Sequence, residues 1–334
     1  MTRRGWLLFV AMSVIWGLPY LLIRVSVREV TPAFLVFVRT AGAALLLAPF
    51  VMRRGALGPL LAHWRPVVLY TLVELAIPWW LLFTAEKEVT SSLAGLLVAA
   101  VPIAGAVIAR LTGTDRLDRR RLAGLALGVA GAGALVGFDV GRSSLLAASS
   151  FLVVVTGYAL GPWILARYLS GVASASVILA SLVLCAVAYA PFAILQAPRH
   201  PVHTAAVLSM VGLTAVCTAL AFTIFFALIK EVGPMRATVI TYLNPAVALV
   251  LGVVVLGESF GWPTGVGFAA VLGGSFLATR SLRPTRPRAG APEGQPGQPE
   301  PEGQLGQPGR PVPALLAGPA AGQPGPPAPR PVVR

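Results

Sequence analysis

The chain has 334 residues, of which 56% are hydrophobic and only 11% are charged, and its formal net charge is +14. Soluble domains carry about a quarter charged residues, so this composition excludes an ordinary soluble protein and predicts an all-α integral membrane protein. The basic residues lie in short clusters between apolar runs, which favours the lipid bilayer over nucleic acid as a partner. Cys185 and Cys217, the only cysteines, provide neither a disulfide framework nor a Cys-x-x-Cys site.

Each apolar run of about 20 residues predicts one transmembrane helix, because the hydrocarbon core leaves no backbone group unpaired. The first half of the chain contains five such runs, at roughly 5–27, 32–52, 65–85, 90–111 and 120–138. The second half contains five more, at roughly 144–166, 173–195, 204–228, 234–256 and 261–280. Over residues 284–334 the composition changes to Pro, Gly, Gln and Glu, which predicts a disordered cytoplasmic tail or a proline-rich ligand for a partner domain.

The same sequence unit occurs once in each half of the chain. Matching residues of the two copies are separated by the same number of positions as Glu88 and Glu231, and we call this spacing the repeat displacement. The matching pairs are Lys87-Glu88-Val89 and Lys230-Glu231-Val232, Pro102 and Pro245, Asp115 and Glu258, Gly124 and Gly267, and Gly131 and Gly274. Internal symmetry in a hydrophobic chain is typical of transporters built from repeated halves. We therefore predict two five-helix repeats, over 5–138 and 144–280.

The distribution of basic residues predicts the orientation in the plasma or inner membrane. With a cytoplasmic N-terminus, the outer loops receive only Arg28, Lys87, Arg142 and Arg199, and the other basic residues near the helices face the cytoplasm. The positive-inside rule therefore favours both termini in the cytoplasm. Because five helices per half is an odd number, the second half enters the membrane upside down, and the repeat is inverted.

Glu74 falls near the middle of the third predicted helix. An acid at the centre of a membrane helix costs about 2.5–3.5 kcal/mol, so this side chain is expected to face the protein interior or a wet cavity. Two interpretations stay open. Glu74 either couples transport to protons or recognises a cationic group, or it is a buried acid that pairs with Arg39 or Arg24 and fixes helix packing.

Arg39 lies inside the second predicted helix. It could bind a substrate carboxylate, pair with Glu74, or reach the head groups by snorkelling, and each of these options spares the charge from isolation in lipid.

Aromatic side chains at membrane depth could line a cavity for amphipathic or aromatic substrates, since Trp and Tyr combine an apolar ring with a polar atom. The candidates are Trp16, Tyr20, Trp79, Trp80, Tyr158 and Tyr242. The alternative for each is the interfacial aromatic belt or plain core packing.

Pro102 and Pro245 interrupt the hydrogen-bond ladder of predicted helices 4 and 9, and Asn244 adds an amide beside the second proline. Such breaks free carbonyl groups for a substrate or act as hinges, although a static kink is the alternative. Small-x-x-x-small spacings predict close helix contacts within the bundle or in a possible homodimer, at Gly124 and Gly128, Gly133 and Gly137, and Gly261 and Gly265. Asp115 and Glu258 are expected to cap the helices that follow them.

No phosphate-binding loop, H-E-x-x-H or G-x-S-x-G motif occurs, and His200-x-x-His203 lacks a third metal ligand. We therefore expect no enzyme activity, no cofactor and no metal, which leaves transport of a small molecule driven by a gradient. The alternative is a receptor or scaffold that acts through its proline-rich tail.

The chain resembles the EamA-like ten-helix members of the drug/metabolite transporter superfamily. The resemblance lies in Trp16-Gly17, the Pro32 and Arg39 pattern, the stretch from Leu243 to Ser259, and Gly267 with Gly274. It implies a central cavity lined by helices 1 to 4 and 6 to 9, both termini in the cytoplasm, and export or exchange of metabolites, amino acids or drugs, often against protons. The hypothesis is a secondary active exporter that works by alternating access, with Glu74 protonatable and Arg39 as a charge partner or anion contact.

Overall fold

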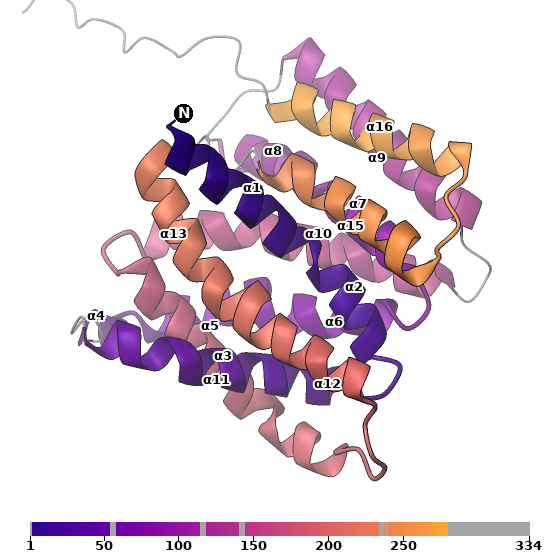
Figure 1. Ribbon diagram of the computed structural model, residues 1–334. Coiled ribbons are helices and arrows are strands. Elements are labelled where there is room, and N and C mark those ends of the chain that lie inside the picture. Colours follow the sequence, from indigo (N-terminus) through magenta and orange to yellow (C-terminus); the bar gives the residue numbers. More distant parts are fainter. Residues whose placement is uncertain are drawn as a thin grey trace, which may run out of the picture. The chain divides into compact units, whose positions relative to one another are not determined.

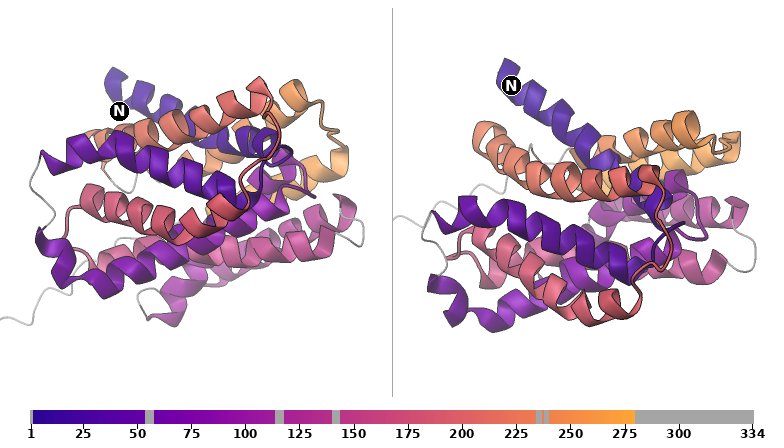
Figure 2. Two further views of the ribbon diagram at one scale, coloured as in Figure 1. Left: turned by 90° about the horizontal axis from the view of Figure 1, so that it is seen from below. Right: turned by 60° about the horizontal axis from the view of Figure 1, so that its bottom comes forward.

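The computed structural model describes residues 2–53, 58–113, 118–139, 144–233, 237 and 240–279. In these ranges helices are the regular secondary structure and no strand occurs, as Figures 1 and 2 show from three sides. Asp115 and the predicted tail over 284–334 lie outside the described residues.

The first half contains α1 (Arg3–Gly17), α2 (Pro19–Ser26), α3 (Pro32–Met52), α4 (Gly58–Ala62), α5 (Trp64–Tyr70), the π-helix η1 (Thr71–Ala76), α6 (Ile77–Ala85), α7 (Ser91–Val98), α8 (Val101–Leu111) and α9 (Arg119–Asp139). The second half contains α10 (Ser144–Tyr168), α11 (Ser174–Leu195), α12 (Thr204–Val211), the π-helix η2 (Gly212–Leu220), α13 (Ala221–Val232), α15 (Ile240–Leu256) and α16 (Trp262–Thr279).

Among the described residues, seven helical spans are long and apolar enough to cross a membrane. They are Arg3–Ser26, Pro32–Met52, Trp64–Ala85, Ser91–Leu111, Ser149–Tyr168, Ser174–Leu195 and Thr204–Val232, and Ile240–Leu256 is a shorter apolar helix. Large apolar side chains such as Leu45, Leu195 and Val254 are exposed on their surfaces. An exposed apolar surface of this kind is suited to lipid, so the chain is a multi-pass membrane protein.

Two of these spans contain a π-helical segment, and the two segments occupy matching positions. The repeat displacement moves Thr71–Ala76 of η1 onto 214–219, which lies inside η2. In η2, Thr218 Oγ1 donates to the Leu213 carbonyl five residues earlier at 2.7 Å. In the first half, Tyr189 of α11 donates to the carbonyl of Ala76, the last residue of η1, at 3.0 Å. The widened turns are thus stabilised by side chains.

Among the helix pairs that join the two halves of the described chain, the most extensive contacts are those of α3 with α11, α7 with α15 and α9 with α16. Figure 1 shows α16 lying along α9. Their contact is made backbone to backbone, because a Cβ on Gly124 would lie 2.8 Å from the Gly274 carbonyl, and one on Gly131 would lie 2.9 Å from the Gly267 carbonyl. Close approach of this kind is what small residues permit in membranes. A Cβ on Gly133 would meet nothing within 4 Å, so that glycine does not contribute.

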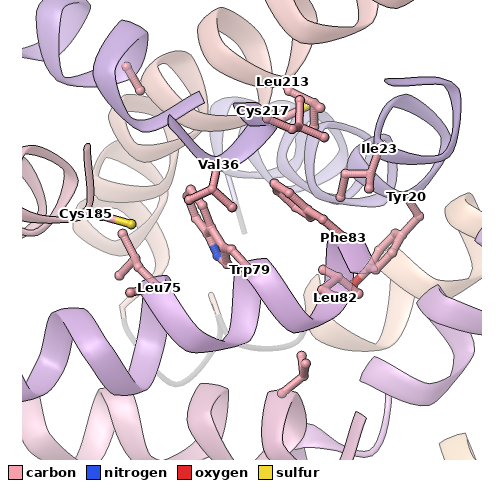
Figure 3. Packing of buried hydrophobic residues seen from close by; sticks show 14 of the residues in the cluster. Tyr20, Ile23, Val36, Leu75, Trp79, Leu82, Phe83, Cys185, Leu213 and Cys217 are labelled. Atoms are coloured by element: carbon pink, nitrogen blue, oxygen red, sulfur yellow. The ribbon is translucent and has the colours of Figure 1, made fainter. Parts of the chain in front are cut away.

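The main hydrophobic core lies between α2, α3, η1, α6, α7, α10 and α11. Figure 3 shows part of it, with Leu75, Trp79, Leu82 and Phe83 projecting from η1 and α6. A smaller cluster joins α1, α13 and α15 around Met12.

Candidate substrate and proton site

Arg39 of α3 is the central polar residue of the core and is only 7% exposed. Its guanidinium carbon lies 3.8 Å from the centre of the Trp79 ring, and its Nε donates to Thr218 Oγ1 at 2.9 Å. In the described part of the chain, no carboxylate forms an ion pair with it. A cation over a desolvated indole gains about 2 kcal/mol or more, which stabilises the charge without neutralising it. The site therefore keeps a positive charge that an anion could neutralise.

Two tyrosines and the acid Glu86 also lie near this charge. Tyr20 of α2 and Tyr158 of α10 lie close enough to interact electrostatically with Arg39. The indole of Trp79 also interacts with the Tyr158 hydroxyl. The structure thus brings together four of the residues that the sequence singled out, from four different helices.

The helix faces explain this convergence. Trp79 and Phe83 are one turn apart on α6, with ring centroids 6.5 Å apart, and they project toward Val36 of α3 and Cys217 of η2 (Figure 3). Thr218, which follows Cys217, reaches Arg39 from the widened turn of η2. Sequence reasoning missed Thr218, because a lone threonine in an apolar run carries no distinctive signal.

Glu74 occupies a separate position in η1, where its carboxylate packs against Gly161 of α10. A Cβ on residue 161 would overlap Glu74 Oε2, so only glycine leaves room for the carboxylate. Within the described chain, Oε2 is buried without a hydrogen-bond partner. Neither expected arginine reaches it: Arg39 lies on Trp79, and Arg24 donates to the backbone carbonyl of Glu86.

A groove of about 350 Å³ runs beside Glu74 between two helical spans. Val73 and Ile77 line one side, and the α10 residues Leu152, Val153, Thr156, Gly157 and Leu160 line the other. Glu74 therefore sits next to an apolar groove at the surface of the bundle, whereas Arg39 sits in its core.

Four other predicted site residues lie away from Arg39. Trp16 packs on Phe225 of α13, with ring centroids 4.7 Å apart. With its amide oriented to satisfy its neighbours, Asn244 donates to the Ser13 carbonyl at 3.1 Å and ties α15 to α1. Tyr242 shares a 2.6 Å hydrogen bond with Thr279 of α16. Trp80 points outward and is 42% exposed.

The two prolines have different surroundings. Just before Pro102 the backbone N–H groups of Ala99 and Ala100 bond three residues back, to the Leu96 and Leu97 carbonyls, so the predicted fourth helix is divided into α7 and α8. Ser275 of α16 donates to the freed Ala99 carbonyl at 2.9 Å. Pro245 is buried inside α15, which continues through it.

Glu258 caps a helix, but the expectation that it caps the one that follows is wrong. Its carboxylate accepts hydrogen bonds from the backbone N–H groups of Ser91 and Ser92 at 2.8 and 2.9 Å, at the start of α7. The helix that follows Glu258 is α16. The cap therefore joins the second half of the chain to the first, which sequence spacing alone did not reveal.

The sequence profile of the EamA-like transporter family matches residues 3–137 and 145–280. YedA, an uncharacterized inner membrane transporter of Escherichia coli K12, is 28% identical over 262 residues, which cover 75% of this chain and 82% of YedA. An uncharacterized transporter of Archaeoglobus fulgidus is 23% identical over 290 residues, which cover 84% of this chain and 98% of that protein. One solved crystal structure, 20% identical, has a TM-score of 0.61 and covers 84% of this chain and 98% of its own, which shows a shared fold.

Proposed function

Because the chain belongs to the EamA-like transporter family of the drug/metabolite transporter superfamily, we propose that this membrane transporter exports small amphipathic metabolites, amino acids or drugs that carry an anionic group. The observation that carries the proposal is the buried Arg39, which is held over an indole and has no carboxylate partner in the described chain. A guanidinium binds a carboxylate through two parallel hydrogen bonds, and the aromatic rings of Trp79 and Tyr158 suit an apolar substrate body.

Proton coupling is assigned to Glu74. A charge in this position, packed against Gly161 with one oxygen unpartnered, is costly, so the neutral form is favoured until water or a cation reaches it. Uptake of a proton from one side and release to the other would then bias the equilibrium between two conformations.

We propose that the chain works by alternating access and that it has ten transmembrane helices in two inverted repeats, since one repeat can rock against the other. Three observations support this arrangement: the constant repeat displacement, the matching π-helices, and the contacts between Gly124 and Gly274 and between Gly131 and Gly267. Gly124 contacts Gly274, the counterpart of Gly131, and Gly131 contacts Gly267, the counterpart of Gly124. A two-fold axis requires this exchange of partners. Pro102 and Pro245 would serve as the hinges.

The orientation and the partners follow from the same proposal. Both termini lie in the cytoplasm, by the positive-inside rule, and the bilayer surrounds the bundle in the plasma or inner membrane. A homodimer is compatible with the exposed apolar surface.

The test compares the growth media of cells that produce the wild type, Arg39→Met or Glu74→Gln at equal membrane levels, by untargeted analysis of small molecules. We expect one class of anionic compound to accumulate outside only with the wild type. Arg65→Met is the matched control, because Arg65 lies over the ring of Trp64 at the exposed surface, 5.3 Å from its centre. Accumulation with Arg39→Met at the wild-type level would overturn the substrate assignment. If the Glu74→Gln variant still transports the compound against its concentration gradient, the proton assignment is overturned.

A further inference from the structure

Glu86 is a buried acid that the proposed function does not use. It follows α6, directly after the span Trp64–Ala85, and is 0% exposed. In the described part of the chain, neither of its carboxylate oxygens has a hydrogen-bond partner. An ionised carboxylate without partners is costly to bury, so the arrangement is suited to the neutral acid.

The charged and titratable groups around Glu86 come from four segments. They are Tyr20 and Arg24 of α2, Arg39 of α3, Tyr158 of α10 and Glu258 after α15. Arg28 lies next to Arg24. Arg24 donates to the backbone carbonyl of Glu86, so its hydrogen bond fixes the end of α6 and leaves the carboxylate unpaired.

The fold does not require an acid at this position. The repeat displacement places the apolar Ile229, at the corresponding end of α13, as the counterpart of Glu86 in the second half. The acid is therefore a feature of the first half alone, located where α2, α6, α7 and the segment 257–261 meet.

We propose that Glu86 is a second proton-binding site of the transporter and that it carries a proton in the conformation described here. The neutral carboxyl is compatible with the closed packing around it. On release of the proton to water, the new negative charge repels Glu258 and attracts Arg24. Glu258 then withdraws from the backbone N–H groups of Ser91 and Ser92, and this end of the bundle opens.

The direction of the pH effect follows from the surroundings. Burial raises the pKa of Glu86 well above its usual value, Arg24 and Arg39 oppose this rise, and Glu258 adds to it. The site therefore holds its proton at low pH and loses it as the pH rises through the raised value. The consequence for transport rests on the proposed function, but the protonation itself does not depend on Glu74 or on a substrate.

The experiment measures hydrogen exchange of the backbone amides of Ser91 and Ser92 in the purified full-length protein, over a pH series and corrected for the intrinsic rate. In the wild type we expect protection to fall by at least about tenfold as the pH rises. Glu86→Gln, which mimics the protonated acid, should stay protected throughout. Glu88→Gln, an exposed acid two residues further on, is the control and should behave as the wild type.

Identical pH profiles for the wild type and Glu86→Gln would overturn the inference. Glu86→Leu provides a second variant in case the glutamine variant fails to fold, because it places an apolar side chain there as Ile229 does in the second half, and it should also lack the pH dependence. The outcomes are separable from those of the proposed function, because exchange needs no transport. Suppose that Arg39→Met loses export and that Glu86→Gln has the same pH profile of exchange as the wild type. This result would support the exporter and rule out the second proton site.

Discussion

The position of the Glu74 carboxylate depends on a single glycine. A Cβ on Gly161 would overlap Oε2 and would lie 2.6 Å from Glu74 Cδ. Overpacking a close contact costs about 1–3 kcal/mol, so we expect Gly161→Ala to displace the carboxylate and to lower export at least about tenfold. The measurement is accumulation of the exported compound at equal membrane levels.

Gly105→Ala in α8 is the matched control, since a Cβ there would meet no atom within 4 Å. This variant should export normally. Equal export by Gly161→Ala and Gly105→Ala would show that the carboxylate does not need its present position.

Arg39 should not tolerate lysine. Lysine keeps the charge but loses the planar group that lies on Trp79 and the fork that holds a carboxylate. We expect Arg39→Lys to fold with nearly the wild-type melting temperature and to bind the exported compound at least about tenfold more weakly. Binding is measured by the shift in melting temperature on adding the compound, and wild-type affinity in Arg39→Lys would contradict a bidentate contact.

At the residue scale, the sequence identified the charged residues that lie within apolar runs, where a charge is costly to place in the membrane. Glu74 interrupts a long apolar run, so a position facing the interior or a wet cavity is expected from the sequence, whereas for Arg39 snorkelling to the head groups stayed an alternative. Glu86 follows the apolar run and is next to Lys87, so the local sequence predicts an exposed acid in a loop. Its burial depends on tertiary structure, in which Arg24 of α2 donates to its backbone carbonyl, and no local pattern encodes that arrangement.

Among the elements, α7 depends on an acid from the other half of the chain. Burial opposes ionisation of Glu258, but hydrogen bonds from Ser92 and Ser91 outweigh it and hold its pKa below the usual 4.5. A depressed pKa stabilises the fold above the unfolded value, and this contribution is lost as the pH falls through the folded value. We expect Glu258→Gln to be about 1 kcal/mol less stable than the wild type at pH 7 and equally stable well below 4.5.

The comparison is made by thermal unfolding in detergent at both pH values. A difference that persists at low pH would show that the shape of the side chain, rather than its charge, stabilises α7.

The contact between α9 and α16 gives a graded prediction. A Cβ on Gly124 would lie 2.7 Å from the backbone nitrogen of Ala278, which cannot move alone, whereas one on Gly267 would lie 2.8 Å from the rotatable side chain of Leu135. We expect Gly124→Ala to lose about 1–3 kcal/mol and Gly267→Ala to lose less. Gly133→Ala has open space and should be neutral or slightly stabilising. Melting temperatures in another order would contradict this packing.

The helix bounds were predictable because a span must reach across the hydrocarbon. The run at 32–52 coincides with α3, and the run at 65–85 differs by one residue from Trp64–Ala85. The internal breaks were only half predictable. Pro102 marks the junction of α7 and α8, but η2 contains no proline, and its widened turn is stabilised by the Thr218 side chain.

For the whole molecule, sequence reasoning could not decide which membrane-depth aromatics share a site. Trp16 and Trp79 look alike in the sequence, yet Trp16 packs on Phe225 in the smaller cluster and Trp79 lies under Arg39. The direction of each side chain depends on how the helices are rotated about their axes. That rotation depends on tertiary contacts between helices, and the pattern of apolar runs in the sequence does not specify those contacts.

The proposed inverted repeat makes its sharpest prediction at two matching loop positions. Arg28, between α2 and α3, and Gly171, between α10 and α11, are both exposed and are related by the repeat displacement. In an inverted repeat, counterparts lie on opposite sides of the membrane. A membrane-impermeant thiol reagent on intact cells should therefore label Arg28→Cys, and Gly171→Cys should react only after permeabilisation. The native Cys185 and Cys217 are buried, so the wild type serves as the unlabelled control. Labelling of both variants from outside would contradict the inversion, and the reverse pattern would keep the inversion but place the termini outside.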